Sequence, residues 1–565
     1  MRRRLVTPRW ILRAAPILAL GILASVGGCA GCRSKAPLGY VPADSLAVVV
    51  VPSLQDSLKH LSLLRQKLEK GVLSGALLAG PAAAVQRELG FDPQQPETLR
   101  KKGINPEQGL AVAVGKEGHV TVILGASDSA LLDKYLREQV NRILRGAAVY
   151  TEKELAGQKM VLAAPQGVQE PLGGWTFVKG HVVIAAGKKG RVAEHLAAIT
   201  KLEASIKDNP SFVELSGKVG RHDLLLYVDG NAARQQHASH ATDALKNSSE
   251  WMHKYLKEQH DAERTLLGYL RGLAVGFSAS AEGAAVRAFY AAPGDRAKLM
   301  REIFTGKGSA PPLAKYLAGD ALLVGRLSLN VKKLVERALE IAPARNKRRV
   351  YETMEHLERD NQLSVDRDVY GVLGGRYAGG LFPPAPGALR SPPRSFSDLV
   401  GSVPVVLMAQ IDDQQKASEL LTRVERFLVM RHQEVRIRSV GDTKVYTLER
   451  DGQPLLSWAL AKGVLVAATA GRLDATLQLI AKGGDSVLDQ VQSPRAKKLL
   501  KSDDGAVLNY NPLKTVEAIG KLDIPPELKL MLSSALSSLG RFKDVTVAVE
   551  AEEGGIAADL SVTLN

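Results

Sequence analysis

Four histidines in this 565-residue sequence stand at spacings that could bring imidazole rings together. His237 and His240 are three residues apart, and His253 and His260 are seven apart, in a stretch with helical periodicity. These spacings place each pair on one helical face, where ring nitrogens can share a metal ion. The stretch is polar, however, and a shared ion needs a third ligand fixed by tertiary contacts. We therefore predict exposed histidines and no resident cofactor, with a metal site as the alternative.

Cys29 and Cys32 are the only cysteines of the chain. Several arginines precede the apolar run Pro16–Gly28, a pattern typical of an export signal and shorter than a membrane-spanning helix. The segment Val26–Cys29 resembles the bacterial lipobox, whose cysteine thiol carries a diacylglycerol. A redox or metal C-x-x-C pair would need a strand-to-helix setting that the flanks lack. We expect residues 1–28 to be a lipoprotein signal peptide, residues 29–39 a tether, and Cys29 the lipidated residue, with Cys32 as the alternative.

Common enzyme motifs are missing from the sequence. It has no phosphate-binding P-loop, dinucleotide fingerprint, zinc-protease motif or nucleophile elbow. Lys and Arg total 75 against 59 for Asp and Glu, giving a net charge of +16, but aromatic residues make up only 5 %. Few stacking platforms are therefore available for single-stranded nucleic acid. We predict that the protein is not an enzyme and has no nucleic-acid partner.

An internal repeat organises the chain, and its positions recur in the same order in both halves. The repeated positions include Pro37 with Pro312, Asp44 with Asp320, Trp175 with Trp458 and Tyr227 with Tyr510. In each half, short strands joined by turns are interspersed with single amphipathic helices, which favours antiparallel sheets. The sequence therefore predicts an α+β fold of two tandem similar units, each a mostly antiparallel sheet with helices packed on one face. The two tryptophans are expected to be core residues.

Each predicted unit has one segment without a counterpart in the other. The first unit, residues 40–308, contains an extended helical segment at about residues 232–272. The second unit, residues 309–565, contains a proline-rich loop at about residues 381–396. These insertions are where a function could have been added to the common fold.

The proline-rich loop is a candidate contact for a partner protein. Pro383, Pro384, Arg390 and Arg394 could form an extended polyproline segment that docks on an aromatic groove. Loop tips also tolerate insertions that carry no function. A plain hairpin tip is therefore the favoured interpretation, and partner contact is the alternative.

The lipobox-like segment and the opening Tyr40–Leu46, with its P-A-D turn before an apolar strand, resemble an uncharacterised family of bacterial exported lipoproteins. The resemblance implies an envelope location, lipid-anchored and facing the periplasm from the outer membrane, and it implies no activity. We expect a non-enzymatic binding or scaffold module for another envelope protein. The alternative is a periplasmic carrier or sensor of a small ligand, lipid or metal held between the two units.

Overall fold

The computed structural model describes residues 37–69, 95–187, 191–246, 249–305, 312–361, 363–385, 402–450, 452–491, 493–522, 533 and 535–565. Contacts within the chain divide it into two compact units. The first unit ends at Ser249 and resumes over Leu267–Ala292, and the second comprises Glu250–Leu266 and Pro293–Asn565. This division differs from the one made from the sequence at residues 308 and 309, because the helix Gly294–Ile303 packs on strands of the second unit.

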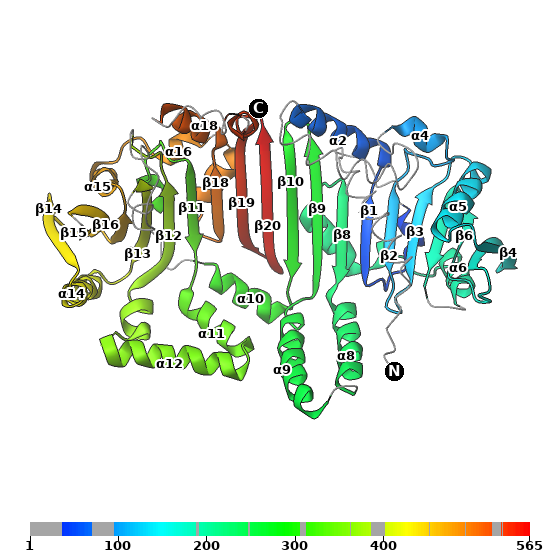
Figure 1. Ribbon diagram of the computed structural model, residues 1–565, viewed down its shortest axis with the longest axis horizontal. Helices are drawn as coiled ribbons and strands as arrows, with labels where there is room; N and C mark the ends of the chain where they lie inside the picture. Colours follow the sequence, from blue (N-terminus) through cyan, green and yellow to red (C-terminus); the bar gives the residue numbers. More distant parts are fainter. Residues whose placement is uncertain are drawn as a thin grey trace. The chain divides into compact units, whose positions relative to one another are not determined.

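Antiparallel strands form the sheet of the first unit (Figure 1). They are β1 (Ala47–Val51), β2 (Leu110–Val114), β3 (Val120–Gly125), β4 (Ala148–Leu155), β5 (Gln158–Pro165), β6 (Gly173–Val178), β7 (His181–Ala186), β8 (Leu224–Asp229), β9 (Gly272–Ser280) and β10 (Gly283–Ala291). Their order across the sheet is β10-β9-β8-β1-β2-β3-β7-β6-β5-β4. Runs rich in valine and alanine account for these strands, because β-branched side chains fit a pleated surface.

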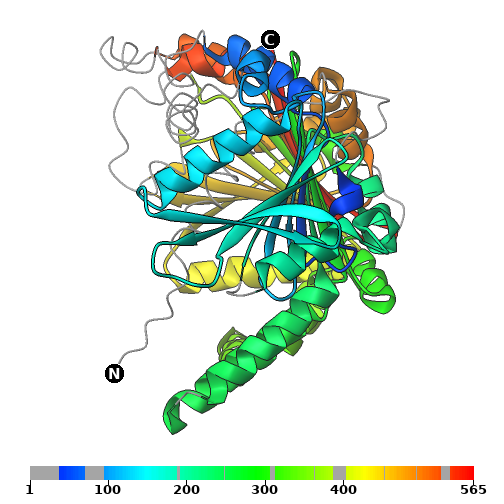
Figure 2. The same ribbon diagram turned by 90° about the vertical axis from the view of Figure 1, so that its right-hand side faces the viewer.

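Helices cover both faces of this sheet. The helices of the first unit are the 3-10 helices η1 (Leu38–Tyr40) and η2 (Ile206–Asp208), and α2 (Leu54–Glu69), α4 (Pro96–Arg100), α5 (Ser129–Ile143), α6 (Val192–Thr200), α7 (Pro210–Val219) and α8 (Gly230–Lys246), of which α8 extends beyond the end of β8 in Figure 1. In β3, Thr121 Oγ1 lies 2.9 Å from His195 Nε2 of α6, whereas the next residue, Val122, packs with Leu132 of α5. Successive strand residues point to opposite faces, so α5 and α6 lie on opposite sides of the sheet. Figure 2 shows α5 as the long cyan helix beside the strands. The prediction of helices on one face is wrong here because both faces of the central strands are apolar.

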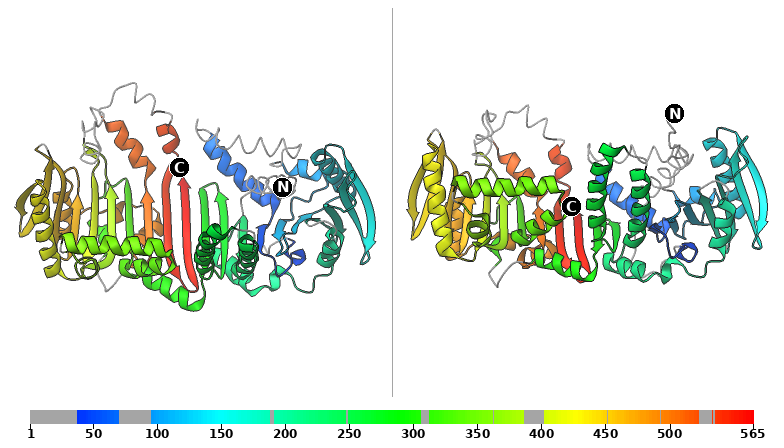
Figure 3. Two further views of the ribbon diagram at one scale, coloured as in Figure 1. Left: turned by 60° about the horizontal axis from the view of Figure 1, so that its bottom comes forward. Right: turned by 90° about the horizontal axis from the view of Figure 1, so that it is seen from below.

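The second unit also has a sheet of antiparallel strands (Figure 3). They are β11 (Leu323–Ser328), β12 (Leu373–Leu381), β13 (Val405–Ile411), β14 (Glu434–Val440), β15 (Thr443–Arg450), β16 (Gln453–Ala461), β17 (Val464–Ala468), β18 (Ala506–Tyr510), β19 (Phe542–Glu552) and β20 (Gly555–Leu564). Their order across the sheet is β20-β19-β18-β11-β12-β13-β17-β16-β15-β14. The predicted α+β class with antiparallel strands is thus confirmed.

The helices of the second unit cover its two sheet faces unequally. They are α9 (Glu250–Leu267, its last residue grouped with the first unit), α10 (Gly294–Ile303), η3 (Leu313–Tyr316), α11 (Val331–Ile341), α12 (Ala344–Asn361), the π-helix η4 (Val365–Tyr370), α14 (Gln414–Met430), α15 (Leu473–Lys482), α16 (Val487–Gln490), α17 (Pro494–Lys501) and α18 (Pro512–Lys521). One face is buried under η3, α15, α16 and α17 in a continuous core. On the other face, α14 covers the outer strands around Trp458, while α11 and α12 lie near the lower strand ends in Figure 1.

Two hairpins show how local sequence sets the chain direction. β6 and β7 are joined by Lys179 and Gly180, and β16 and β17 by Lys462 and Gly463. The φ angles are 43° and 76° in the first turn and 47° and 76° in the second. Two consecutive positive φ angles are typical of the type I′ turn, whose twist matches that of the strands it joins. Glycine accepts this geometry without cost, whereas the lysines adopt it under strain.

Candidate functional site

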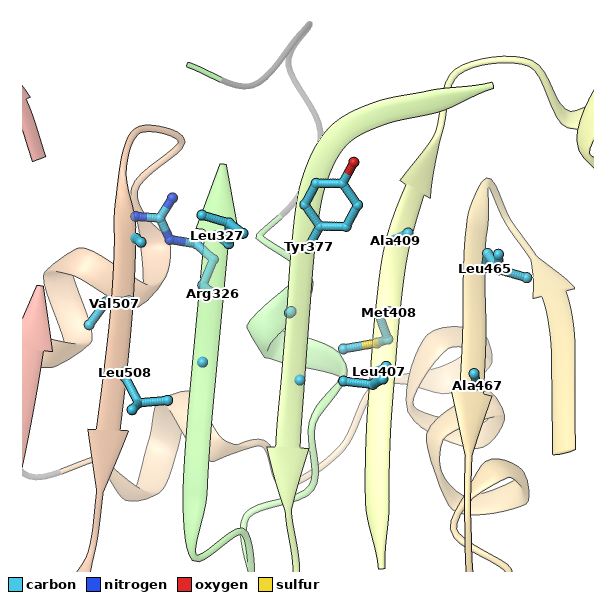
Figure 4. A pocket seen from close by; sticks show the side chains of 14 residues that line it. Arg326, Leu327, Tyr377, Leu407, Met408, Ala409, Leu465, Ala467, Val507 and Leu508 are labelled. Atoms are coloured by element: carbon cyan, nitrogen blue, oxygen red, sulfur yellow. The ribbon is translucent and has the colours of Figure 1, made fainter. Parts of the chain in front are cut away.

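An apolar groove lies on the same sheet face of the second unit as α14, over the strands that α14 does not cover (Figure 4). Its volume is about 510 Å³, within the range of small-molecule binding sites. The lining residues, from five adjacent strands, are Gly325, Arg326, Leu327, Tyr377, Ala378, Gly379, Leu407, Met408, Ala409, Leu465, Ala467, Ala506, Val507 and Leu508. Arg326 contributes no charge to the groove. Its guanidinium donates to the carbonyl oxygens of Asp504 and Gly505 and to Ser328 Oγ, so it is engaged within the protein.

Strand register explains why this face is hollow. Gly325 of β11 pairs with Leu508 of β18 on one side and with Gly379 of β12 on the other, and Gly379 pairs with Leu407 of β13. Two glycines thus stand side by side between two leucines. A Cβ atom added to Gly379 would lie 3.0 Å from Leu407 Cδ2, and one added to Gly325 would lie 3.3 Å from Leu508 Cδ1. The glycines form the floor of the groove and the leucines its walls.

The leucine walls are unusually open for large apolar side chains. Leu407 is 59 % exposed and Leu508 is 43 % exposed. The exposed row continues outward, because Leu508 pairs with Val547 and Val547 with Leu560. Val547 and Leu560 are 42 % and 40 % exposed. Contiguous apolar surface of this kind is typical of binding sites.

The corresponding sheet face of the first unit is filled and covered. There Val49 of β1 pairs with Leu226 of β8 and with Val112 of β2. Val49 and Val112 pack against the buried cluster that contains Leu54 and Leu58 of α2. Valines thus stand where the second unit has glycines, and a helix covers them. The helix that follows β11, α11, instead contacts α10 and η4.

A smaller, polar pocket adjoins the groove at Tyr377, which lines both. Its volume is about 290 Å³, and its lining includes Lys332, Lys333 and Glu336 of α11 and Tyr370 of η4. Lys332 Nζ lies 3.0 Å from Asp366 Oδ1, and Lys333 Nζ pairs with Glu302. Burial raises the pKa of the Tyr377 phenol, and its buried Oη has no hydrogen-bond partner among the described residues. Tyr377 therefore offers a hydroxyl where the apolar groove meets the charged pocket.

The predicted histidine cluster lies on α8 and α9. His237 is on α8, and His253 and His260 are on α9, where His260 Nδ1 lies 3.3 Å from Glu263 Oε2 one turn away. His253 is exposed, and nothing is described of the His240 side chain. The two helices fall in different units of the chain. The metal site stays a prediction.

The other predicted site residues lie largely outside the described residues. This holds for Cys29, Arg390 and Arg394, whereas Pro383 and Pro384 follow the end of β12 and are half-buried. None of the helices in the described part of the chain combines the length and apolar character needed to cross a bilayer. Lipidation and partner contact at these residues stay predictions.

A buried carboxylate in the first unit was missed in the sequence. Asp223, directly before β8, is 1 % exposed. Its Oδ2 accepts a hydrogen bond of 2.8 Å from the Ala279 backbone N–H, and its Oδ1 lies 4.0 Å from His60 Nδ1 of α2. Burial raises the pKa of the Asp223 carboxyl to about 7, and the nearby Asp56 carboxylate also raises it. Asp223 thus links β8, β9 and the helix that covers them.

A stacked histidine pair was missed as well, because its members are far apart in the sequence. The His119 and His195 ring centroids are 4.6 Å apart with an interplanar angle of 17°. Burial, together with the smaller effect of the neighbouring His119, lowers the pKa of His195 to about 4. Parallel rings direct their nitrogen lone pairs along parallel planes, which disfavours shared metal ligation. The pair is therefore best understood as packing between α6 and the residue that precedes β3.

The groove could have been anticipated from one signal in the sequence. Gly325 and Gly379 interrupt runs that are otherwise typical of strands, and glycine within a strand often marks the close approach of a ligand or another backbone. The absence of a covering helix, by contrast, depends on tertiary packing and had no local signal.

Comparison with known proteins adds little to this description. No family model and no curated protein matches the sequence. Among solved structures, crystal form IV of TP0453 aligns with 45 % of this chain and 80 % of its own at 10 % identity and a TM-score of 0.23. Crystal form III aligns with 48 % of this chain and 88 % of its own at 10 % identity and a TM-score of 0.22. Similarity at this level supports no inference about function.

Proposed function

We propose that this chain is a non-enzymatic binding protein of the bacterial cell envelope, anchored by a lipid at Cys29, and that the groove of the second unit holds its apolar ligand. The observation that carries the proposal is the glycine-floored groove between Leu407 and Leu508. Apolar side chains that are exposed to water are unfavourable, and a ligand that covers them is therefore bound more tightly. The proposal places the ligand within one unit, whereas the sequence suggested a carrier site between the units.

The proposal includes a duplication of one α+β unit. The shared strand order supports it, since β1 to β10 and β11 to β20 follow the same path across their sheets. The turns at Lys179 and Lys462, with the same sequence of positive φ angles, support it too. In this proposal, the first copy keeps valines and a packed helix, α2, on this sheet face. In the second copy, glycines replace the valines and no helix covers them, which leaves the groove.

A scaffold for another envelope protein is the second candidate. The exposed row beyond the groove, with Val547 and Leu560, favours it, because a protein partner could cover more of this surface than a small ligand. The proline-rich loop would be a further contact in that case.

Purification of the native protein from cells tests both candidates. We expect about one apolar small molecule per chain in solvent extracts analysed by mass spectrometry, and its loss from a Gly325→Val/Gly379→Val double variant. Recovery of one stoichiometric protein after crosslinking, without a small molecule, would favour the scaffold. A Cys29→Ala form run in parallel should leave the membrane fraction. Its retention there would contradict lipidation at Cys29.

A further inference from the structure

We infer that α11 is a lid of the groove, which turns about Leu329 and Asn330 and packs over the glycine floor, as α2 packs over the valines of the first unit. This inference rests on the proposed function, because it states how access to the same groove is controlled. Three observations carry it. The apolar stripe of α11 is not buried, the corresponding helix of the first unit covers the corresponding sheet face, and the length of α11 fits the groove.

The sequence of α11 is that of a helix that packs against other elements along one face. Val331, Leu334, Val335 and Ala338 recur at the spacing of a single helical stripe. None of the side chains of residues 331–340 is buried, however, and Leu334 is 39 % exposed. An amphipathic helix gains most of its stability when such a stripe is removed from water. In its observed position against α10 and η4, α11 therefore has an apolar face that is only partly covered.

The first unit has a helix at the same point of the chain, packed on its sheet. α2 begins three residues after the end of β1, as α11 begins three residues after the end of β11. Leu58 lies four residues, or about 6 Å, along α2. It belongs to the cluster against which Val49 packs, and Val49 lies about 6.6 Å before the end of β1. α2 thus folds back along the strand that precedes it.

The dimensions of α11 allow it to fold back in the same way. Gly325 lies three residues before the end of β11, which is about 10 Å. The 11 residues of α11 span about 16 Å, so the helix reaches over the paired Gly325 and Gly379. The glycine floor leaves room for the side chains of Leu334 and Val335. The 18 residues of α12 span about 27 Å, enough to return the chain from the far end of α11 to η4.

The contacts that hold α11 away from the sheet are exposed. Lys332 Nζ lies 3.0 Å from Asp366 Oδ1 of η4. Lys333 pairs with Glu302 of α10, and all four side chains are at least 39 % exposed. Exposed ion pairs contribute little to stability. Residues of α11 and β12 both line the polar pocket of about 290 Å³, so a cavity lies between them at this point. Closure therefore breaks two weak ion pairs and buries an apolar stripe.

A disulfide trap in the full chain tests the lid. The Cys29→Ala/Cys32→Ala form has no cysteine, and Leu334→Cys/Leu508→Cys adds one thiol on α11 and one on the groove wall. Both positions are more than a third exposed, so neither replacement removes a buried side chain. Under mild oxidation we expect an intramolecular disulfide at least tenfold faster than in Leu334→Cys/Ile437→Cys, the matched control. Its second position is equally exposed but lies on the outermost strand, β14.

Further changes in the trap should shift the rate in opposite directions. Val335→Asp places a charge on the apolar stripe and should slow the disulfide at least tenfold. Lys332→Gln/Lys333→Gln removes both ion pairs and should accelerate it. Lys444→Gln, at an exposed lysine of β15, should leave the rate unchanged. Each rate is normalised to the reactivity of the single thiols with a soluble maleimide, which corrects for the effect of nearby charges on the thiols.

Binding of an apolar probe separates the lid from the proposed function. Diphenylhexatriene, an uncharged probe that fluoresces in apolar sites, should bind the reduced trap, be lost on oxidation and bind again after reduction with dithiothreitol. A disulfide no faster than in the control pair, or one that joins two chains, would overturn the lid and leave the groove standing. Equal probe binding by the oxidised and reduced trap would also overturn it. A fast disulfide with no probe bound in either state would support the lid and remove the small-ligand form of the proposed function.

Discussion

Replacing Asp223 with asparagine should remove a pH dependence from the stability of the first unit. The Asp223 pKa rises from about 3.9 in an unfolded chain to about 7 in the fold. A raised carboxyl pKa means that the folded state binds the proton more tightly. Its stabilising contribution is therefore complete below pH 4 and is lost as the pH rises through 7. At about 1.4 kcal/mol per pH unit, the contribution that disappears over this interval is at most about 4 kcal/mol.

The Asp223→Asn variant keeps the acceptor for the Ala279 N–H and cannot ionise. We expect the parent chain to lose stability relative to this variant as the pH rises from 4.5 to 8, and the variant to be the more stable of the two at pH 8. Hydrogen exchange of the Ala279 amide, corrected for its intrinsic rate at each pH, measures the opening free energy of this region directly.

Asp44→Asn serves as the control, because Asp44 is an exposed carboxylate of the same unit. Its exchange profile at Ala279 should follow the parent chain at every pH. Parallel curves for Asp223→Asn and the parent would refute the reasoning, since they would mean that Asp223 is ionised in the fold at low pH or is reached by water.

Two further predictions concern strained and charged positions. Lys179→Gly should raise the free energy of unfolding, measured by urea titration, by about 1 kcal/mol, because glycine adopts positive φ without strain. Lys462→Gly should raise it less, because Lys462 Nζ also donates to the last carbonyl oxygens of α15. An equal increase in the two variants would contradict this capping role of Lys462. Arg423→Met should loosen η4 and speed its proteolysis, because Arg423 and Arg367 both bond the buried Asp368. Unchanged proteolysis in this variant would show that η4 is held by other contacts. These cations also hold the pKa of Asp368 well below its usual range, so η4 in the parent chain should loosen as the pH falls through that low pKa.

Much of the fold could be predicted because it depends on local patterns. The apolar runs located the strands, and the recurrence of Trp175 as Trp458 identified two buried positions opposite β7 and β17. The tyrosine match was wrong by one residue: Tyr227 pairs with Val48, whereas Asn509, not Tyr510, pairs with the corresponding Val324. A slip of one residue moves a strand side chain to the opposite face.

The candidate site was harder to predict because it depends on which strands pair and on which helices pack over the sheet. Gly325 and Gly379 are 54 residues apart in the sequence, and only the β11–β12 register places them side by side. Likewise, amphipathic periodicity predicted the helices after β1 and β11 but not that α2 packs over its sheet while α11 contacts α10 and η4. Periodicity specifies that a helix has an apolar face, and tertiary packing decides what covers it.

The paired glycines also have a mechanical consequence. Contacts between paired side chains stabilise the pairing of neighbouring strands. Gly325 and Gly379 are paired and have no side chains, so they make no such contact with each other. Gly380, paired with Val324, continues this weakness along β12. The β11–β12 ladder therefore lacks these side-chain contacts between the strands that carry the groove floor, and a change in its twist would move the Leu407 and Leu508 walls relative to each other. If the groove holds an apolar ligand as proposed, its width would follow the curvature of these two strands and not the packing of the core on the other face.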